Sequence, residues 1–428
     1  MMTGPGKTRV AVIGGGWAGC TAALTLAEAG ISTTLYESSR TLGGRARKVE
    51  LEGQPLDNGQ HILLGAYEQT LQLIARLHPS SADEALWRLP LAIDQPPDFS
   101  MACPRLPAPM HLLAGLLGAD GLSVREKLAA ARWVHAVLKG PDAPGTQTVS
   151  QLTHSQPEKL SRLLWHPLCI SALNTPPETA SARVFQDVMR AAFGGRTRHS
   201  DLLLPRRDLT ALLPAPAASR LVELGGDVRL SSRVRMLDAT AASVTAASND
   251  ETATYSHVIL AVAPQHLPAL ATHVPALKPT GDAVAGYDYQ PIATGYLQYD
   301  PEFKLDKPMF ALANGPAQYV FDRGQSHGQA GLLAFVASAA AHLSPDWLDQ
   351  AEAQLQRIAR PGAPKWRKAI VEKQATYACL PDMPRPAVRT AHPRIFLAGD
   401  YTAGAYPATL ESATSSGVQS ARALLDQL

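Results

Sequence analysis

Apolar and polar positions near the start of the chain follow the order expected of a strand, a helix and a second strand. Residues 10–13 form a β-branched apolar run that is typical of a buried parallel strand. Residues 20–29 are mostly small and apolar and predict a helix, which Gly30 would end in a left-handed conformation. Residues 32–36 predict the second strand. This order favours an α/β fold.

Apolar patterns further along the chain divide it into two kinds of region. Residues 258–264 and 394–400 each predict an apolar strand that stops at a turn, as expected for strands that rejoin the first sheet. Apolar residues recur at helical spacing over 123–138, whereas 294–299 and 331–336 alternate as strands do. We therefore expect a discontinuous first domain over 1–75, 215–265 and 390–428, and a second, inserted α+β domain over 76–214 and 266–389.

The turn between the first strand and the first helix carries a dinucleotide-binding pattern. Gly14 would permit the tight turn, Gly16 the approach of a pyrophosphate, and Gly19 the close packing of the helix on the strand. Glu37 ends the second strand about 20 residues on, where a carboxylate would bind a ribose hydroxyl. The alternative is an ordinary glycine turn. The dinucleotide-binding residues predicted here are Gly14, Gly16, Trp17, Ala18, Gly19 and Glu37.

The residues after Glu37 favour FAD over a nicotinamide cofactor. The paired glycines Gly43 and Gly44 would let the backbone lie against a ligand, and Arg45 is placed to neutralise phosphate. Arg40 belongs to the same turn. The alternative is a surface turn with solvated arginines.

The C-terminal region holds a second unit of strand, turn and acidic residue. A strand stops at Gly399 and Asp400, and a helix is predicted over about 408–425. This unit resembles the closing FAD element of the glutathione-reductase-like flavoproteins. The resemblance implies that Asp400 holds the ribityl or pyrophosphate part, and that the backbone of Val234 meets the adenine. It also implies that the last helix points its start, Ala408, Thr409 and Leu410, toward the flavin. The expected fold is therefore a glutathione-reductase-like FAD-binding Rossmann domain with an inserted α+β substrate domain.

Composition excludes several other classes of protein. The net charge is +2 and 18% of the 428 residues are charged, which gives no support for nucleic-acid binding. The four cysteines, Cys20, Cys103, Cys169 and Cys379, are scattered, so neither a metal site nor a disulfide framework is expected. The short polar start, residues 1–7, predicts no signal peptide, and no apolar run is long enough to span a membrane. We expect a cytoplasmic protein.

One segment nevertheless bears on membranes. Residues 106–118 are apolar and too short to span a bilayer, and a basic amphipathic stretch with Arg125, Lys127, Arg132 and Lys139 follows. One interpretation is an interfacial segment that contacts the inner face of the plasma membrane, where a lipid-soluble substrate enters. The other is a helix of the substrate-domain core.

Five further motifs resemble one family. The segment 56–67 is similar to the flavin-proximal segment of the phytoene-desaturase and amine-oxidase superfamily. Residues 165–177 and 200–205 resemble the mid-chain signature of its squalene-associated branch, and 399–402 with 406–413 resemble its closing FAD motif. On these motifs the chain is identified as a member of the hydroxysqualene dehydroxylase family.

Membership implies the reduction of hydroxysqualene to squalene in hopanoid and squalene synthesis, with hydride from a reduced flavin. The expected substrate is hydroxysqualene or a similar C30 isoprenoid. Gly59, Gln60 and His61 would lie beside the cofactor. The resemblance also predicts the pattern Glu-Gly-Ala at 411–413, at the start of the flavin-facing helix. This chain has serine, Ser412, in place of the glycine.

An acid that protonates the departing hydroxyl would help the reaction, since water leaves better than hydroxide. The predicted candidates are His61, Asp201 and Tyr406. Each has a structural alternative: His61 could bind the cofactor or a neighbouring loop, Asp201 could cap a turn or join a salt bridge, and Tyr406 could shape the turn before Pro407.

Other polar residues are open to similar alternatives. Cys169 has an apolar neighbourhood and no evident base, which favours an inert buried cysteine. Asn174 and Thr175 could orient the substrate hydroxyl or end a helix before two prolines. Glu411 suits a helix start with or without a flavin.

Two other functions remain open from the sequence. One is an oxidative desaturase of a carotenoid or squalene-type polyene, in which the flavin accepts hydride, and fold analogy cannot settle that direction. The other is a flavin-bearing or lipid-carrying partner of a prenyl synthase. No second Rossmann fingerprint is evident, so free nicotinamide and an electron-donor reductase both remain candidates for reducing the flavin.

Overall fold

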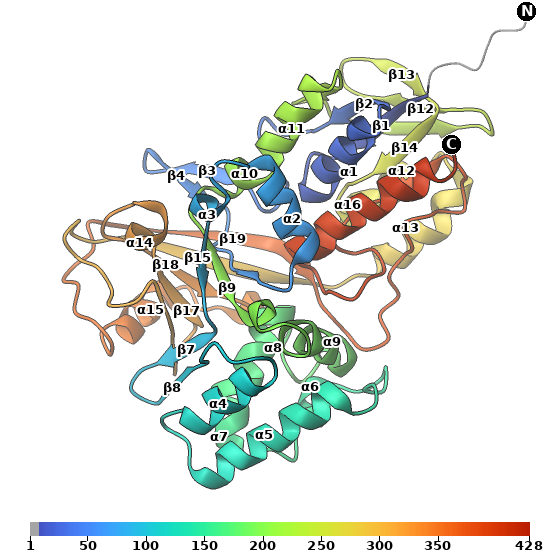
Figure 1. Cartoon of the computed structure of the whole chain (residues 1–428). Helices are drawn as coiled ribbons and strands as arrows, with labels where there is room; N and C mark the ends of the chain where they lie inside the picture. Colours follow the sequence, from blue (N-terminus) through green and yellow to red (C-terminus); the bar gives the residue numbers. More distant parts are fainter. Residues whose placement is uncertain (1–7) are drawn as a thin grey trace, which may run out of the picture.

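A five-stranded parallel sheet organises the half of the molecule that holds the first described residues and the C-terminus (Figure 1). The computed structural model describes residues 8–428, and the expectation about a signal peptide falls on residues 1–7, outside this range. The strand order is β10 (Asp227–Arg229), β2 (Ser32–Tyr36), β1 (Arg9–Ile13), β14 (His257–Leu260) and β20 (Ile395–Leu397). Strands distant in sequence thus meet in one sheet, and the predicted Rossmann-type α/β fold is confirmed.

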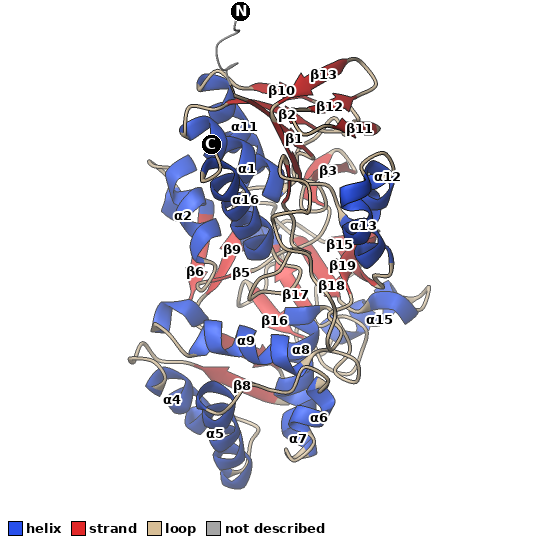
Figure 2. Ribbon diagram, turned by 90° about the vertical axis from the view of Figure 1, so that its right-hand side faces the viewer, coloured by secondary structure: helices blue, strands red, loops and turns tan. Residues whose placement is uncertain are grey.

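Helices cover one face of this sheet. Helix α1 (Trp17–Glu28) packs against α16 (Leu410–Leu425) and α11 (Pro214–Glu223), and Figure 2 shows the three together beside β1. The packing is close because α16 has a glycine at the crossing: a Cβ on Gly417 would lie 2.4 Å from the Ala18 carbonyl oxygen. The remaining elements of this half are α2 (Glu68–Leu77), α3 (Ala82–Ala85), α10 (Leu209–Leu212), β3 (Lys48–Leu51), β4 (Gln54–Asp57), β11 (Met236–Ala239), β12 (Val244–Ala247) and β13 (Thr252–Tyr255).

A second five-stranded sheet is antiparallel. Its order is β16 (Met309–Ala311), β17 (Tyr319–Asp322), β18 (Leu332–Ala337), β15 (Tyr289–Gln298) and β19 (Trp366–Tyr377). The two strands predicted by alternation in the second insertion are therefore β15 and β18, and they pair directly. Helices α14 (Arg323–His327) and α15 (Trp347–Leu355) complete this region.

The first insertion is mainly helical and forms the end of the molecule away from both termini (Figure 1). The predicted helix over 123–138 is α5 (Val124–Lys139), which Ser123 and Glu126 begin with a capping box. Further elements of this insertion are α4 (Met110–Gly118), α6 (Val149–Thr153), α7 (Glu158–Leu160), α8 (His166–Leu173), α9 (Ala182–Phe193), β6 (Leu86–Leu89), β7 (Ala92–Gln95), β8 (Phe99–Ala102) and β9 (Leu202–Pro205). Strand β5 (Leu63–Leu64) precedes the insertion and pairs with β9.

The domain division stays a prediction. Helices α12 (Leu267–Ala271) and α13 (Lys278–Ala285) lie in the second insertion, yet their apolar residues share a core with β14 and β20. Among residues 8–428, none of the helices is long and apolar enough to cross a membrane. In the same range, His, Cys, Asp and Glu side chains nowhere form a group that could hold a metal ion.

Candidate active site

The glycine turn between β1 and α1 forms one wall of a cavity of about 570 Å³. Gly14 has φ +111°, and a Cβ there would lie 2.4 Å from the Ala261 carbonyl oxygen, so this position needs glycine. Gly16 precedes α1 without a side-chain cap, and the nearest atom to a Cβ built there is 3.9 Å away. The first N–H groups of α1 have no partner within the helix, and Trp17 and Ala18 line the cavity, which suits a pyrophosphate.

Glu37 stabilises the glycine turn through a hydrogen bond to its backbone. One of its carboxylate oxygens accepts a hydrogen bond from the Gly15 N–H at 2.7 Å, and the other accepts from the Ser39 N–H at 2.7 Å. The side chain is buried but still lines the cavity. Backbone hydrogen bonds thus fix the Glu37 carboxylate, which the sequence predicts to bind a ribose hydroxyl, in the cavity wall.

Arg45 and Asp400 form an ion pair in the wall of the same cavity. An Arg45 guanidinium nitrogen donates to Asp400 Oδ1 at 2.6 Å, and the other donates to the Ala375 carbonyl oxygen at 2.8 Å. Both side chains line the cavity although 355 positions separate them in sequence. A cationic group next to a carboxylate provides partners for phosphate and for ribityl or ribose hydroxyls, respectively.

The start of α16 faces the same cavity. The Thr409 hydroxyl caps the helix by accepting from the Ser412 N–H at 3.1 Å. The Ser412 hydroxyl donates to the Asp400 carbonyl oxygen at 3.1 Å and accepts from Arg385 at 3.3 Å. The serine that departs from the family pattern therefore ties the helix start to the loop that carries Asp400.

Most of the predicted cofactor-binding residues line this one cavity. Gly19, Arg40 and Val234 do not: Gly19 packs α1 against the turn, Arg40 is exposed, and Val234 is buried in the core beside β11. The sequence patterns did not single out a group of further lining residues, several of which come from the antiparallel sheet. The predicted residues that line the cavity are Gly14, Gly16, Trp17, Ala18, Glu37, Gly43, Gly44, Arg45, Gly59, Gln60, His61, Gly399, Asp400, Ala408, Thr409 and Leu410, and the additional ones include Asn58, Ala261, Gln265, Ile292, Phe321, Val336, Glu372 and Thr376.

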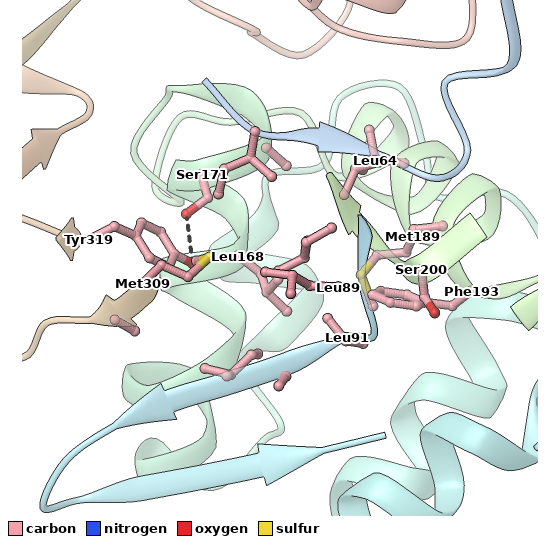
Figure 3. A pocket seen from close by; sticks show the side chains of 18 of the residues that line it. Leu64, Leu89, Leu91, Leu168, Ser171, Met189, Phe193, Ser200, Met309 and Tyr319 are labelled. Atoms are coloured by element: carbon pink, nitrogen blue, oxygen red, sulfur yellow. Dashed lines mark hydrogen bonds between the residues drawn. The ribbon is translucent and has the colours of Figure 1, made fainter. Parts of the chain in front are cut away.

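A second cavity, of about 340 Å³, adjoins the first and is predominantly apolar (Figure 3). Its wall comes from α8, α9, β6, β7 and β16, with side chains such as Leu89, Leu168, Met189 and Met309 pointing inward (Figure 3). The sequence motifs did not reveal this cavity, although Leu168 and Leu202, which line it, lie in the segments 165–177 and 200–205. The two cavities share six lining residues, Ile62, Tyr67, Ser171, Ala172, Tyr319 and Thr409, so they join at this position.

His61 lies in the first cavity but is poorly suited to donate a proton. Its Nδ1 is 2.7 Å from the Gly59 carbonyl oxygen, and burial lowers the pKa of the imidazole below its usual value. A neutral ring with the proton on Nδ1 presents Nε2 as an acceptor. This geometry fits the structural alternative, in which His61 binds its neighbouring loop.

Asp201 and Tyr406 are both engaged with the protein. Asp201 pairs with Arg88 at 3.1 Å and lines neither cavity, as its structural alternative proposed. Tyr406 lines the apolar cavity, where its hydroxyl donates to the Ala66 carbonyl oxygen at 2.9 Å and its ring packs edge-on against Tyr67. Burial raises the pKa of Tyr406, which keeps that phenol protonated. The structure therefore does not bring the three candidate acids together.

Several other polar residues have structural roles. Asn174 ends α8 in the left-handed conformation and bonds Thr376 and the Ala339 N–H at 2.9 and 2.6 Å. Glu411 accepts from the Gln69 and Thr70 N–H groups and so caps α2. Thr175 accepts from the Cys379 N–H at 2.9 Å, and Cys169 is fully buried, which raises the pKa of its thiol.

A buried ion pair supports the flavin-proximal segment from behind, and the sequence did not mark it. Arg323 on α14 reaches Asp57 at 3.3 Å and donates to the Gln60 side-chain oxygen at 2.8 Å. Burial raises the pKa of Asp57, while Arg323 and the Leu209 N–H stabilise its charged form. His327, 3.8 Å from Asp57, has its pKa lowered to about 3 by burial and by Arg323, so it stays neutral. Arg323 therefore fixes Gln60 at the cavity wall.

Comparison with known proteins places this architecture in one family. Residues 17–425 match the family described as flavin containing amine oxidoreductase. Proteins named hydroxysqualene dehydroxylase from Sinorhizobium fredii and Rhodopseudomonas palustris are 28% and 27% identical, with 98% and 97% of this chain and 98% of each relative covered. A 15-cis-phytoene desaturase of Narcissus pseudonarcissus is 25% identical over 97% of this chain and 79% of its own length.

Solved structures agree at the level of the fold. A putrescine oxidase has a TM-score of 0.72 at 16% identity, with 98% of this chain and 99% of that one covered. The predicted resemblance and the predicted FAD-dependent oxidoreductase are confirmed by these matches. The glycine turn, the two helix starts and the Arg45–Asp400 pair fit that cofactor. This chain belongs to the flavin containing amine oxidoreductase family.

Proposed function

We propose that this protein removes the hydroxyl group of hydroxysqualene and releases squalene, using FAD. The observation that carries the proposal is the apolar cavity that opens directly into the flavin cavity through six shared residues. A long hydrocarbon gains free energy by leaving water for such a lining. The names of the relatives from S. fredii and R. palustris support the same substrate.

The chemistry divides between the cofactor and the protein. FAD, when bound and reduced, would supply hydride to carbon. The protein binds the chain, excludes water and assists the hydroxyl that departs. Atoms balance when the substrate C–O bond breaks, a C–H bond forms with hydride, and the hydroxyl leaves as water after taking one proton.

An oxidative polyene desaturase is the second candidate, and the phytoene desaturase relative favours it. The same two cavities would suit that reaction, because a desaturase also needs a hydrocarbon beside a flavin. The direction of hydride transfer separates the two functions.

The decisive experiment follows flavin absorbance without oxygen. Chemically reduced, FAD-loaded protein is mixed with hydroxysqualene, and products are identified by mass spectrometry. We expect flavin reoxidation in step with the appearance of squalene. If the flavin stays reduced, while the oxidised protein is bleached by a polyene that gains a double bond, the desaturase is correct. If neither occurs although lipid binds, the protein acts as a lipid or flavin carrier.

We further propose that α4 contacts an anionic membrane surface. Met110, Leu113 and Leu117 follow one face of the helix and are 45–58% exposed, while the opposite face is buried. Leu106, just before the helix, is also exposed. The exposed basic side chains of Arg105, Arg125 and Arg132 are close in sequence and suit anionic lipid headgroups. On its buried side, His111 of α4 lies 3.0 Å from Ser200, which lines the apolar cavity.

Flotation with lipid vesicles tests this contact. We expect the protein to float with vesicles that contain phosphatidylglycerol, and the double variant L113D/L117D to lose about ten-fold in binding, because charged groups enter the acyl region at a cost. V222D, at an exposed position on α11, is the matched control. Equal flotation of the double variant and the wild type would contradict the proposal.

A further inference from the structure

The junction of the two cavities carries a pair of hydroxyl groups to which the sequence motifs assign no role. Tyr319 begins β17, Ser171 lies on α8, and both line both cavities. Their hydroxyl oxygens are 3.4 Å apart, and Figure 3 shows the Tyr319 hydroxyl directed at Ser171 inside the pocket. The Ser171 hydroxyl also donates to the Pro167 carbonyl oxygen at 2.7 Å.

Outside the junction, the polar groups around the apolar cavity already have partners. Asp94 pairs with Lys307 at 2.6 Å, and the Ser200 hydroxyl donates to the Thr197 carbonyl oxygen at 2.8 Å while lying against His111. Tyr406 donates to Ala66 as described above. Ser171 is the donor in its 3.4 Å contact with Tyr319, and its proton has a shorter bond, at 2.7 Å, to the Pro167 carbonyl oxygen. No acceptor takes the Tyr319 proton among residues 8–428, so this proton can be given to a ligand.

We propose that Tyr319 donates the proton on which the substrate hydroxyl leaves, and that Ser171 positions the Tyr319 phenol. This inference rests on the proposed dehydroxylation. The C–O bond breaks, the Tyr319 proton joins the departing oxygen as water, and hydride from the reduced flavin forms the new C–H bond. The phenolate left on Tyr319 is stabilised when the Ser171 hydroxyl turns its proton from the Pro167 carbonyl oxygen to the phenolate, which then regains a proton from solvent.

The surroundings of Tyr319 suit this role. Burial raises the pKa of its phenol above the usual value, so the proton is present throughout the neutral pH range. The hydrogen bond with Ser171 acts in the opposite direction and favours the charged form that appears after transfer. Tyr319 thus holds a proton where the apolar cavity meets the flavin cavity, which is where the hydroxyl of a C30 alcohol would need it.

Tyr67 is the rival donor, because its hydroxyl belongs to the same junction. Burial raises its pKa as well, and the Thr409 side chain hydrogen-bonds to it. The Tyr67 ring packs edge-on against Tyr406, with ring centres 5.6 Å apart. Thr409 is in turn used as the cap of α16. The Y67F variant is therefore measured beside Y319F.

The test measures single-turnover reoxidation of the chemically reduced holoenzyme by hydroxysqualene. Removal of a general acid typically costs about 10²–10⁴ in rate, and we expect this loss for Y319F. Flavin content and affinity for squalene, which has no hydroxyl, should be unchanged. We expect S171A to lose about ten-fold, as for a lost hydrogen bond. Y299F is the matched control, since the Tyr299 hydroxyl bonds Glu352 at 3.5 Å and lines neither cavity.

A solvent deuterium isotope effect adds a readout that a structural role would not move. We expect a slower reaction of the wild type in D₂O, and a changed effect in S171A even if Y319F were unable to fold. A Y319F rate within three-fold of wild type, or the large loss in Y67F instead, would overturn the assignment. An S171A variant with the wild-type rate and isotope effect would also overturn it. If wild-type protein is not reoxidised by hydroxysqualene at all, the proposed function itself fails.

Discussion

The two adjoining cavities are built in opposite ways. The flavin cavity is lined by glycines, charged groups and two helix starts, which come from a few continuous motifs such as 14–19 and 43–45. The apolar cavity is lined by leucine, methionine and phenylalanine side chains scattered between residues 62 and 409. The first needs particular backbone geometry, whereas the second needs only volume and hydrophobicity. The comparison explains why one is visible as a motif and the other is not.

The largest effect should follow from breaking the backbone geometry of the flavin cavity. In G14A the new Cβ would lie 2.4 Å from a backbone oxygen at a position with φ +111°, so the turn must shift. We expect the purified variant to lack the flavin absorbance and to lose at least about 1–3 kcal/mol of stability. Thermal unfolding and bound flavin measure this.

G286A is the control for that variant. Gly286 has no atom within 4 Å of a built Cβ and ends α13 with φ −85°, which alanine adopts. A G14A protein that binds FAD as wild type does would show that the glycine turn is not part of the cofactor site.

A charge in the apolar cavity should impair substrate binding and leave flavin binding intact. In L168D a carboxylate would face Leu89 and Met309, and burying it without a partner costs several kcal/mol. We expect the variant to keep its flavin spectrum, while the KM for hydroxysqualene rises about 100-fold or turnover disappears. V222D carries the same change on an exposed surface of α11 and should behave as wild type. Unchanged turnover in L168D would mean that the substrate binds elsewhere.

The smallest expected effect concerns the departure from the family pattern. S412G would remove the hydrogen bonds of the Ser412 hydroxyl with the Asp400 carbonyl and with Arg385, at 3.1 and 3.3 Å. We expect about a 2- to 10-fold weaker affinity for FAD, within the net contribution of a typical hydrogen bond, because both bonds act on the cofactor only through the loop of Asp400. Titration of the apoprotein with FAD measures this. An equal or higher affinity in S412G would indicate that the serine does not stabilise the loop of Asp400.

The candidate acids show where sequence reasoning stopped. His61, Asp201 and Tyr406 were chosen because they lie in motifs, but each is held by a hydrogen bond or ion pair that the motifs did not predict, such as the ion pair of Asp201 with Arg88. Tyr319 lies outside every motif. It reaches the junction only because β17 pairs with β18 in the second sheet and faces α8 from there.

The sequence by itself determined the β1–α1–β2 unit, the C-terminal strand and helix, helix α5 and most of the flavin cavity. These features depend on local geometry, namely glycine at positive φ, helix capping and the period of apolar residues, so neighbouring residues encode them. Only the tertiary structure decided the apolar cavity, the Arg323–Asp57 pair and the Tyr319–Ser171 junction. Asp57 and Arg323 are 266 positions apart in sequence, and Ser171 and Tyr319 are 148 positions apart. No local pattern specifies which distant side chains meet when the sheets and helices pack.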